Sequence, residues 1–177
     1  MTIALALQAG LSRAGSNDDL LFLQLLGPGG QTSFDVDLAC VAETATSEPQ
    51  CATVHKAFDE WANARQIKLR SIGKDDPEFE GKLTPAQGPA AEYRVAILFE
   101  PVVVSTMNIW GGTFNNYTPG SAGFRARLFI YDANSGALVR KLEFHDRKQL
   151  PDDANVTPAI GAEVQAVIAK LDPGYTP

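Results

Sequence analysis

The strongest structural signal in this sequence is Tyr93-Arg94-Val95-Ala96-Ile97-Leu98-Phe99-Glu100. One parity of this run is strongly apolar and the other is mixed. Successive side chains of a strand point to opposite faces, so the run predicts a strand with one face against a core. Val102-Val103-Val104 continues the strand to Ser105 in β-branched residues. Pro101 cannot donate a ladder hydrogen bond and therefore predicts a bulge or an edge position.

Two further strands follow this one along the chain. Phe124–Tyr131 alternates apolar and polar residues, and Leu138–His145 does so with apolar residues at 138, 142 and 144. The segment between them is Asp132-Ala133-Asn134-Ser135-Gly136, in which the acid and amide favour local turns and glycine supplies positive φ. These two strands are therefore predicted to form a β-hairpin.

Strands are also predicted in the first half of the chain. The continuous apolar run at 20–26 stops at Gly27-Pro28-Gly29-Gly30, and its short length favours a buried strand over a helix. Phe34–Leu38 alternates cleanly and predicts a second strand, and Ile67–Ile72 predicts a short one. Residues 73–91 are rich in proline, glycine and acidic residues and predict a surface loop.

Two helices are predicted, over residues 48–66 and 158–171. The first follows Ser47 as its N-cap, has proline in its first turn, and carries an apolar stripe that includes Phe58 and Trp61. The second begins at Thr157-Pro158 and has one apolar face.

Together these elements predict one α+β (or α/β) domain over residues 1–177. We expect a mainly antiparallel sheet of about five or six strands, with both helices packed on one face. A length of 177 residues and a hydrophobic content of 45% suit a single domain with a substantial core. Residues 20–177 are interpreted as this core. Residues 1–19 are interpreted as a flexible or signal-remnant N-terminus, although they lack the basic residues that open a signal peptide.

Charge and composition exclude several classes of function. The net charge of −6 argues against a nucleic-acid partner, since nucleic-acid binders present positive charge to phosphates. The sequence has no apolar run of membrane-spanning length, so we expect no transmembrane segment. Cysteine and histidine do not recur at metal-ligand spacing. We therefore expect no metal and no cofactor.

The two cysteines, Cys40 and Cys51, predict a disulfide. Ten residues separate them, so the bond would close a short loop and hold the strand before it to the first turn of the helix. A disulfide implies an oxidising compartment. The alternative interpretation is a pair of buried thiols in a cytosolic protein.

The sequence shows no catalytic motif, and we expect the protein not to be an enzyme. The two histidines, His55 and His145, fall on different predicted elements without a nucleophile motif nearby. The adjacent acids at 18–19, 75–76 and 152–153 all lie in polar segments, where such pairs are usually solvated.

The segment 106–121 is the candidate site for binding another protein. It is predicted to be a long loop carrying the aromatic residues Trp110, Phe114 and Tyr117. A few aromatic side chains often dominate the energy of a protein interface. The alternative is that these side chains cover the edge of the sheet.

The stretch Glu92 to Pro173 resembles a broad group of bacterial cell-envelope proteins, many of them lipoproteins of unknown function. The resemblance rests on the strand Tyr93–Val104, the Trp110/Gly111/Tyr117 segment, the hairpin Leu128–Val139 and a closing helix. It implies a periplasmic or outer-membrane-associated domain that assists an envelope assembly, with no cofactor and no catalytic residue. The sequence lacks an apolar stretch leading into a lipid-attachment cysteine, because acidic residues precede Cys40.

We therefore expect a non-enzymatic protein of the bacterial periplasm or cell envelope that binds another protein as an accessory or assembly component. Three alternatives remain at this point. The first is an inhibitor or immunity protein of a periplasmic enzyme, the second a virion or tail-assembly protein, and the third a small hydrolase.

Overall fold

The computed structural model of the chain describes residue 25 and residues 33–44, 47–85, 91–110, 113–151 and 155–177; within these, 105–119 are described by backbone alone. The interpretation of residues 1–19 and most of the strand predicted at 20–26 lie outside the described residues. Leu25 is described: it is helical rather than extended, and its side chain is fully buried in the core.

Five strands form one sheet in the order β2-β1-β3-β4-β5. Their bounds are β1 Phe34–Cys40, β2 Leu69–Ser71, β3 Tyr93–Trp110, β4 Thr113–Asp132 and β5 Leu138–Gln149. The long ladders between β3, β4 and β5 are antiparallel, whereas β1 runs parallel to both β2 and β3. The predicted fold class is confirmed, and the sheet is mixed because β1 enters it in parallel.

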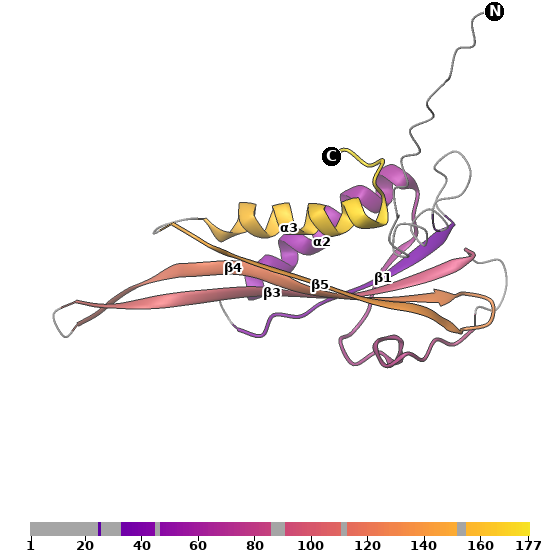
Figure 1. The fold of residues 1–177 in the computed structure, drawn as a ribbon, viewed down its shortest axis with the longest axis horizontal. Coiled ribbons are helices and arrows are strands. Elements are labelled where there is room, and N and C mark those ends of the chain that lie inside the picture. Colours follow the sequence, from indigo (N-terminus) through magenta and orange to yellow (C-terminus); the bar gives the residue numbers. More distant parts are fainter. Residues whose placement is uncertain (1–24, 26–32, 45–46, 86–90, 111–112, 152–154) are drawn as a thin grey trace, which may run out of the picture.

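The two helices, α2 (Glu48–Arg65) and α3 (Val156–Leu171), cover one face of the sheet (Figure 1). Alternate residues of each strand point toward them, which is the consequence of the two-residue period seen in the sequence. The core between the layers includes Trp61, Phe58 and Phe99, and the ring of Phe99 stacks on that of Phe124 with centroids 5.3 Å apart. No helix among the described residues is long and apolar enough to cross a membrane.

The positions of the helix ends match the sequence, but the predicted N-cap of α2 makes no side-chain capping bond. Ser47 precedes α2 as expected, yet its side chain makes no capping bond to the helix. Ser47 is therefore the N-cap residue, as predicted, but its hydroxyl hydrogen-bonds the Thr44 hydroxyl instead of a backbone N–H of the helix. At the start of α3, Asn155 Oδ1 accepts a hydrogen bond from the Thr157 backbone N–H at 3.0 Å.

The turn between β4 and β5 is confirmed. Asp132 Oδ1 accepts hydrogen bonds from the backbone N–H groups of Asn134 and Ser135, at 3.0 and 2.7 Å. Gly136 has a φ of 71°, the left-handed conformation that glycine adopts without steric cost.

The other face of the sheet is partly covered by residues 73–85, which we call the strap (Figure 1). The sequence predicts a surface loop here, but the strap contains a 3₁₀ turn, η1, at Pro77–Glu80. Phe79 and Leu83 of the strap pack on Ala96, Phe129 and Tyr131 of the sheet. This second apolar cluster explains why the strap is not a solvated loop throughout.

Candidate functional site

The β3–β4 ladder continues well beyond the rest of the sheet. β1 ends where Cys40 pairs with Phe99, and β5 ends where Gln149 pairs with Ser121. The antiparallel pairing of β3 and β4 nevertheless continues to Trp110 and Thr113. Residues 105–110 and 113–119, which we call the arm, therefore form a two-stranded ribbon that extends past the body of the molecule (Figure 1).

The arm contains the three aromatic residues that the sequence selected as partner-binding. Trp110 lies at the end of β3, and Phe114 and Tyr117 lie in β4, paired with Ile109 and Met107. Their side chains lie outside the described structure, as do residues 111–112. The predicted long loop over 106–121 was wrong, because most of this segment is paired strand. The ladder shifts register between Val104 and Ser105 and between Met107 and Ile109, not at Pro101.

Of the bulge or edge position predicted for Pro101, the structure shows the edge position. It pairs with Phe124 in the β4 ladder and lies just past the end of β1, where β3 has lost its neighbour on that side. A missing N–H costs little at such an edge.

The arm lies within a stretch that has no charged residue. Residues 101–124 contain no Asp, Glu, Lys or Arg, although 20% of the whole chain is charged. The exposed edge strand β5 has the opposite composition, with charges at Arg140, Lys141, Glu143, Asp146, Arg147 and Lys148. Charges on an edge strand discourage pairing with another chain. Apart from its bulges and Pro119, the arm lacks this protection.

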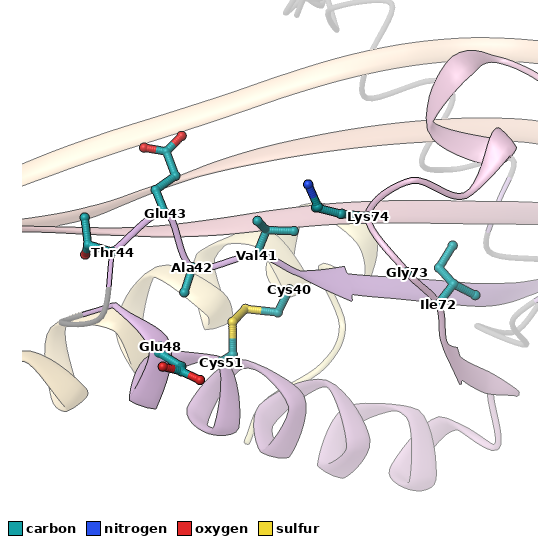
Figure 2. Close-up of a pocket in the computed structure, with 10 residues that line it drawn as sticks. All are labelled: Cys40, Val41, Ala42, Glu43, Thr44, Glu48, Cys51, Ile72, Gly73 and Lys74. Atoms are coloured by element: carbon teal, nitrogen blue, oxygen red, sulfur yellow. A yellow bond between two sulfur atoms is a disulfide. The ribbon is translucent and has the colours of Figure 1, made fainter.

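The predicted disulfide between Cys40 and Cys51 is present, with the two Cα atoms 5.6 Å apart. It joins the end of β1 to the first turn of α2 (Figure 2). The bond also lines an open pocket of about 590 Å³. The charged residues around this pocket are Glu43, Glu48 and Lys74, and no described histidine or free thiol adjoins them. We interpret this part of the molecule as a structural tie.

A second group of charged side chains lies under the strap, where β1, β2 and β3 are adjacent. Asp37 is 1% exposed. It accepts hydrogen bonds from Arg70 Nε at 2.7 Å, Arg70 Nη2 at 3.0 Å and Arg94 Nη1 at 2.7 Å. Arg70 Nη2 also donates to Glu78 Oε1 of the strap, at 2.9 Å. Two arginines thus contact two buried carboxyl groups.

Burial and neighbouring charges move the two carboxyl pKa values apart. For Asp37, burial alone would raise the pKa, but the hydrogen bonds from Arg70 and Arg94 outweigh it and the pKa is lowered. For Glu78, burial and then the adjacent Asp37 carboxylate raise the pKa to about 7. Asp37 is therefore the ionised partner of the arginines, and Glu78 holds a proton up to near-neutral pH.

The structure does not bring the remaining candidates for chemistry together. His55 lies on α2, whereas His145 is exposed on β5 and, by strand alternation, faces the side away from the helices. Within the described part of the chain, no group of three or more His, Cys, Asp or Glu could hold a metal ion.

Strand alternation is a partial signal for the charged group under the strap. Alternation in Phe34–Leu38 and Tyr93–Glu100 places Asp37 and Arg94 on the face opposite the core. Their meeting requires the parallel pairing of β1 with β3, in which Asp37 lies opposite Ala96. Glu78 had no signal, since it lies in a segment whose composition indicates a loop.

The fold and the arm define an α+β protein with a projecting two-stranded ribbon. No family model matches the sequence, and no curated protein matches it. Among solved structures, the chain is similar to a protein from Helicobacter pylori described as a homolog of neuraminyllactose-binding hemagglutinin, at 8% identity and a TM-score of 0.49 over 81% of this chain and 82% of the other.

Two more solved structures show comparable likeness. A PelC dodecamer from Paraburkholderia phytofirmans is 14% identical with a TM-score of 0.41, covering 78% of this chain and 85% of the other. A minor lipoprotein from Acinetobacter baumannii is 11% identical with a TM-score of 0.35, covering 78% and 92%. Similarity at this level assigns neither a family nor a function.

Proposed function

We propose that this chain is a non-enzymatic protein that binds another protein through the arm, and that it works in the bacterial cell envelope. The observation that carries the proposal is the arm itself. In the described part of the chain, β3 beyond Val104 and β4 before Gly120 form ladder pairs only with each other. A two-stranded ribbon is marginally stable in water on its own, so a covering partner would stabilise it.

The composition of the arm supports a protein partner. It combines free strand edges, no charge and three aromatic residues, and these features suit recognition by strand addition with aromatic anchors. The disulfide supports the location, because such bonds persist in oxidising compartments such as the periplasm. If the partner proves to be an enzyme that the chain blocks, the role is that of an inhibitor.

The first test removes the arm without disturbing the body. Val104 and Ser121 face each other in the ladder, so residues 105–120 can be replaced by Asn-Gly, the preferred two-residue hairpin turn. We expect this variant to lose the partner that the full chain captures from a bacterial envelope extract, with free energy of unfolding unchanged to within about 0.5 kcal/mol. Affinity is then measured with the purified partner.

Two further variants distinguish the arm from other surfaces. The double substitution Trp110→Ala and Tyr117→Ala should weaken binding by about tenfold or more, as expected for aromatic anchors. The control is Val139→Ser, which alters an exposed apolar residue beside the turn between β4 and β5, and it should bind normally. Full binding by the chain without its arm would refute the proposal. Free thiols in the natively isolated protein would contradict the proposed location.

A further inference from the structure

Contacts of three kinds hold the strap on the sheet, and they do not involve the arm. The ring of Phe79 packs edge-on against that of Phe129, with centroids 5.9 Å apart. The Tyr131 hydroxyl donates a hydrogen bond to the Glu78 backbone carbonyl. The third contact is the Glu78 side chain, which enters the charged group formed by Asp37, Arg70 and Arg94.

The Glu78 carboxyl is only half satisfied as an anion. The residue is 6% exposed, and Arg70 reaches its Oε1 while Arg94 Nη1 lies 3.8 Å from the same atom. Its Oε2 is buried without any hydrogen-bond partner among the described residues. A buried carboxylate oxygen without a donor destabilises the folded state. A proton on this carboxyl turns it into a donor that can bond to the Asp37 carboxylate.

Every element around Glu78 contributes a charged or titratable group. Asp37 comes from β1, Arg70 from β2, Arg94 from β3 and Tyr131 from β4, while Asp76 lies at the start of η1. The negative charges of the Asp37 and Asp76 carboxylates disfavour ionisation of Glu78. The guanidinium groups of Arg70 and Arg94 favour ionisation of Glu78, but three of their hydrogen bonds are already made to Asp37.

We infer that the strap is a proton-dependent cover: protonated Glu78 holds it on the sheet, and loss of that proton loosens it. Loosening would expose the apolar surface of Phe129 and Tyr131, which Phe79 and Leu83 now cover. It would also open the cavity of about 390 Å³ beneath the strap, which Arg70, Glu78 and Arg94 line.

The direction of the pH dependence follows from linkage. The Glu78 pKa is raised in the closed strap, so its stabilising contribution is complete below its usual pKa and is lost as pH rises through about 7. With an ordinary pKa in the open strap, the equilibrium constant for opening should rise about tenfold between about pH 6 and about pH 8.

Amide hydrogen exchange of the full chain tests this inference. The N–H groups of Phe79, Gly81 and Lys82 donate to carbonyls of the same short turn. A 3₁₀ turn of four residues is not stable without its packing on the sheet, so exchange of these groups reports opening of the strap. After correction for the intrinsic pH dependence of exchange, their protection should fall about tenfold from about pH 6 to about pH 8. Constant protection across this range would overturn the proposal.

Two isosteric variants supply the control. Glu78→Gln keeps a neutral side chain at every pH, so its protection should not change with pH. Glu80→Gln removes an exposed carboxylate of the same turn, paired with Lys82, and should behave as the wild type does. An equal pH response in Glu78→Gln would overturn the inference. If that variant fails to fold, NMR titration of the wild-type Glu78 carboxyl decides: a midpoint near about 7 supports the inference, and an ordinary glutamate midpoint overturns it.

Discussion

Asp172 holds the C-terminal ends of the two helices together. It is 2% exposed and caps α3, and it accepts hydrogen bonds from Trp61 Nε1 at 3.2 Å and from Arg65 Nε at 2.6 Å. Truncation would leave the buried indole N–H of Trp61 without its acceptor, while Arg65, 30% exposed, can turn toward water. The carboxylate is therefore a point on which helix docking depends.

We predict that Asp172→Ala lowers the free energy of unfolding by about 2–3 kcal/mol, because it breaks a largely buried charged network. Urea denaturation measures this change. The control is Asp59→Ala, which removes the same charge from an exposed position of α2 and should change stability by less than about 0.5 kcal/mol. Equal losses in both variants would mean that the network contributes nothing specific.

Individual residues show where sequence reasoning succeeds and where it fails. Asp132 and Gly136 were predictable because the chemistry of a turn is local. Asp172 follows directly on the predicted helix 158–171, but its bonds to Trp61 and Arg65 depend on packing between segments more than 100 residues apart. Glu78 was hidden for the same reason, since its partners come from β1, β2 and β3.

At the scale of elements, the backbone of β5 lies against Gly123 of β4 with no room for a side chain. A Cβ atom there would lie 2.1 Å from the Asp146 carbonyl oxygen and 2.7 Å from the Arg147 Cα. Both are backbone atoms, so no side chain can move away to make room. This glycine is needed for space rather than for an unusual φ, because its φ lies outside the positive range.

We predict that Gly123→Ala destabilises the protein by about 1–3 kcal/mol, the usual cost of overpacking, through separation of β5 from β4. Thermal unfolding followed by circular dichroism measures the effect. Gly73→Ala is the matched control, because a Cβ at Gly73 meets nothing within 4 Å. A melting temperature for Gly123→Ala equal to that of the control would show that the strands tolerate the added methyl group.

The arm is the element for which the amino-acid composition was the poorest guide, because it predicted a loop. Its glycine, proline and asparagine residues are typical of loops, and β-propensity is a weak guide against a continuing ladder. Once β3 and β4 are paired in the body, each further pair adds to an existing register. Shifts beside Ser105 and Met107 adjust the ladder where the local sequence fits it poorly. The helices and the β4–β5 hairpin were predicted because their periodic patterns are strong.

For the whole molecule, the disulfide is the main covalent constraint, and its contribution can be estimated. Replacing Cys40 and Cys51 by serine should lower the free energy of unfolding by about 2–3 kcal/mol, since the bond closes a short loop in the unfolded chain. Chemical denaturation with and without a reductant measures this loss. The reductant should affect the wild type alone, and a stable reduced wild type would contradict the estimate.

For the sheet as a whole, only the antiparallel part could be predicted from the sequence. Hairpin partners are neighbours along the chain, so turn residues indicate their pairing. The pairing of Phe34 with Tyr93 joins segments 59 residues apart, and neither strand carries a local mark of the other. The covered faces were predictable from alternation, whereas the order β2-β1-β3 required the structure.

This order has a consequence for how the chain is made. Synthesis proceeds from the N-terminus, so β1, α2 and β2 are made before β3, the strand that joins β1 to β4 in the described sheet. At about 5–20 residues per second, Phe99 is synthesised roughly 2–10 s after Cys51. Cys40 and Cys51 both lie in the segment that is made before β3. Where the chain enters an oxidising compartment from its N-terminus, the bond between them can fix β1 to its helix before β3 arrives to pair with β1.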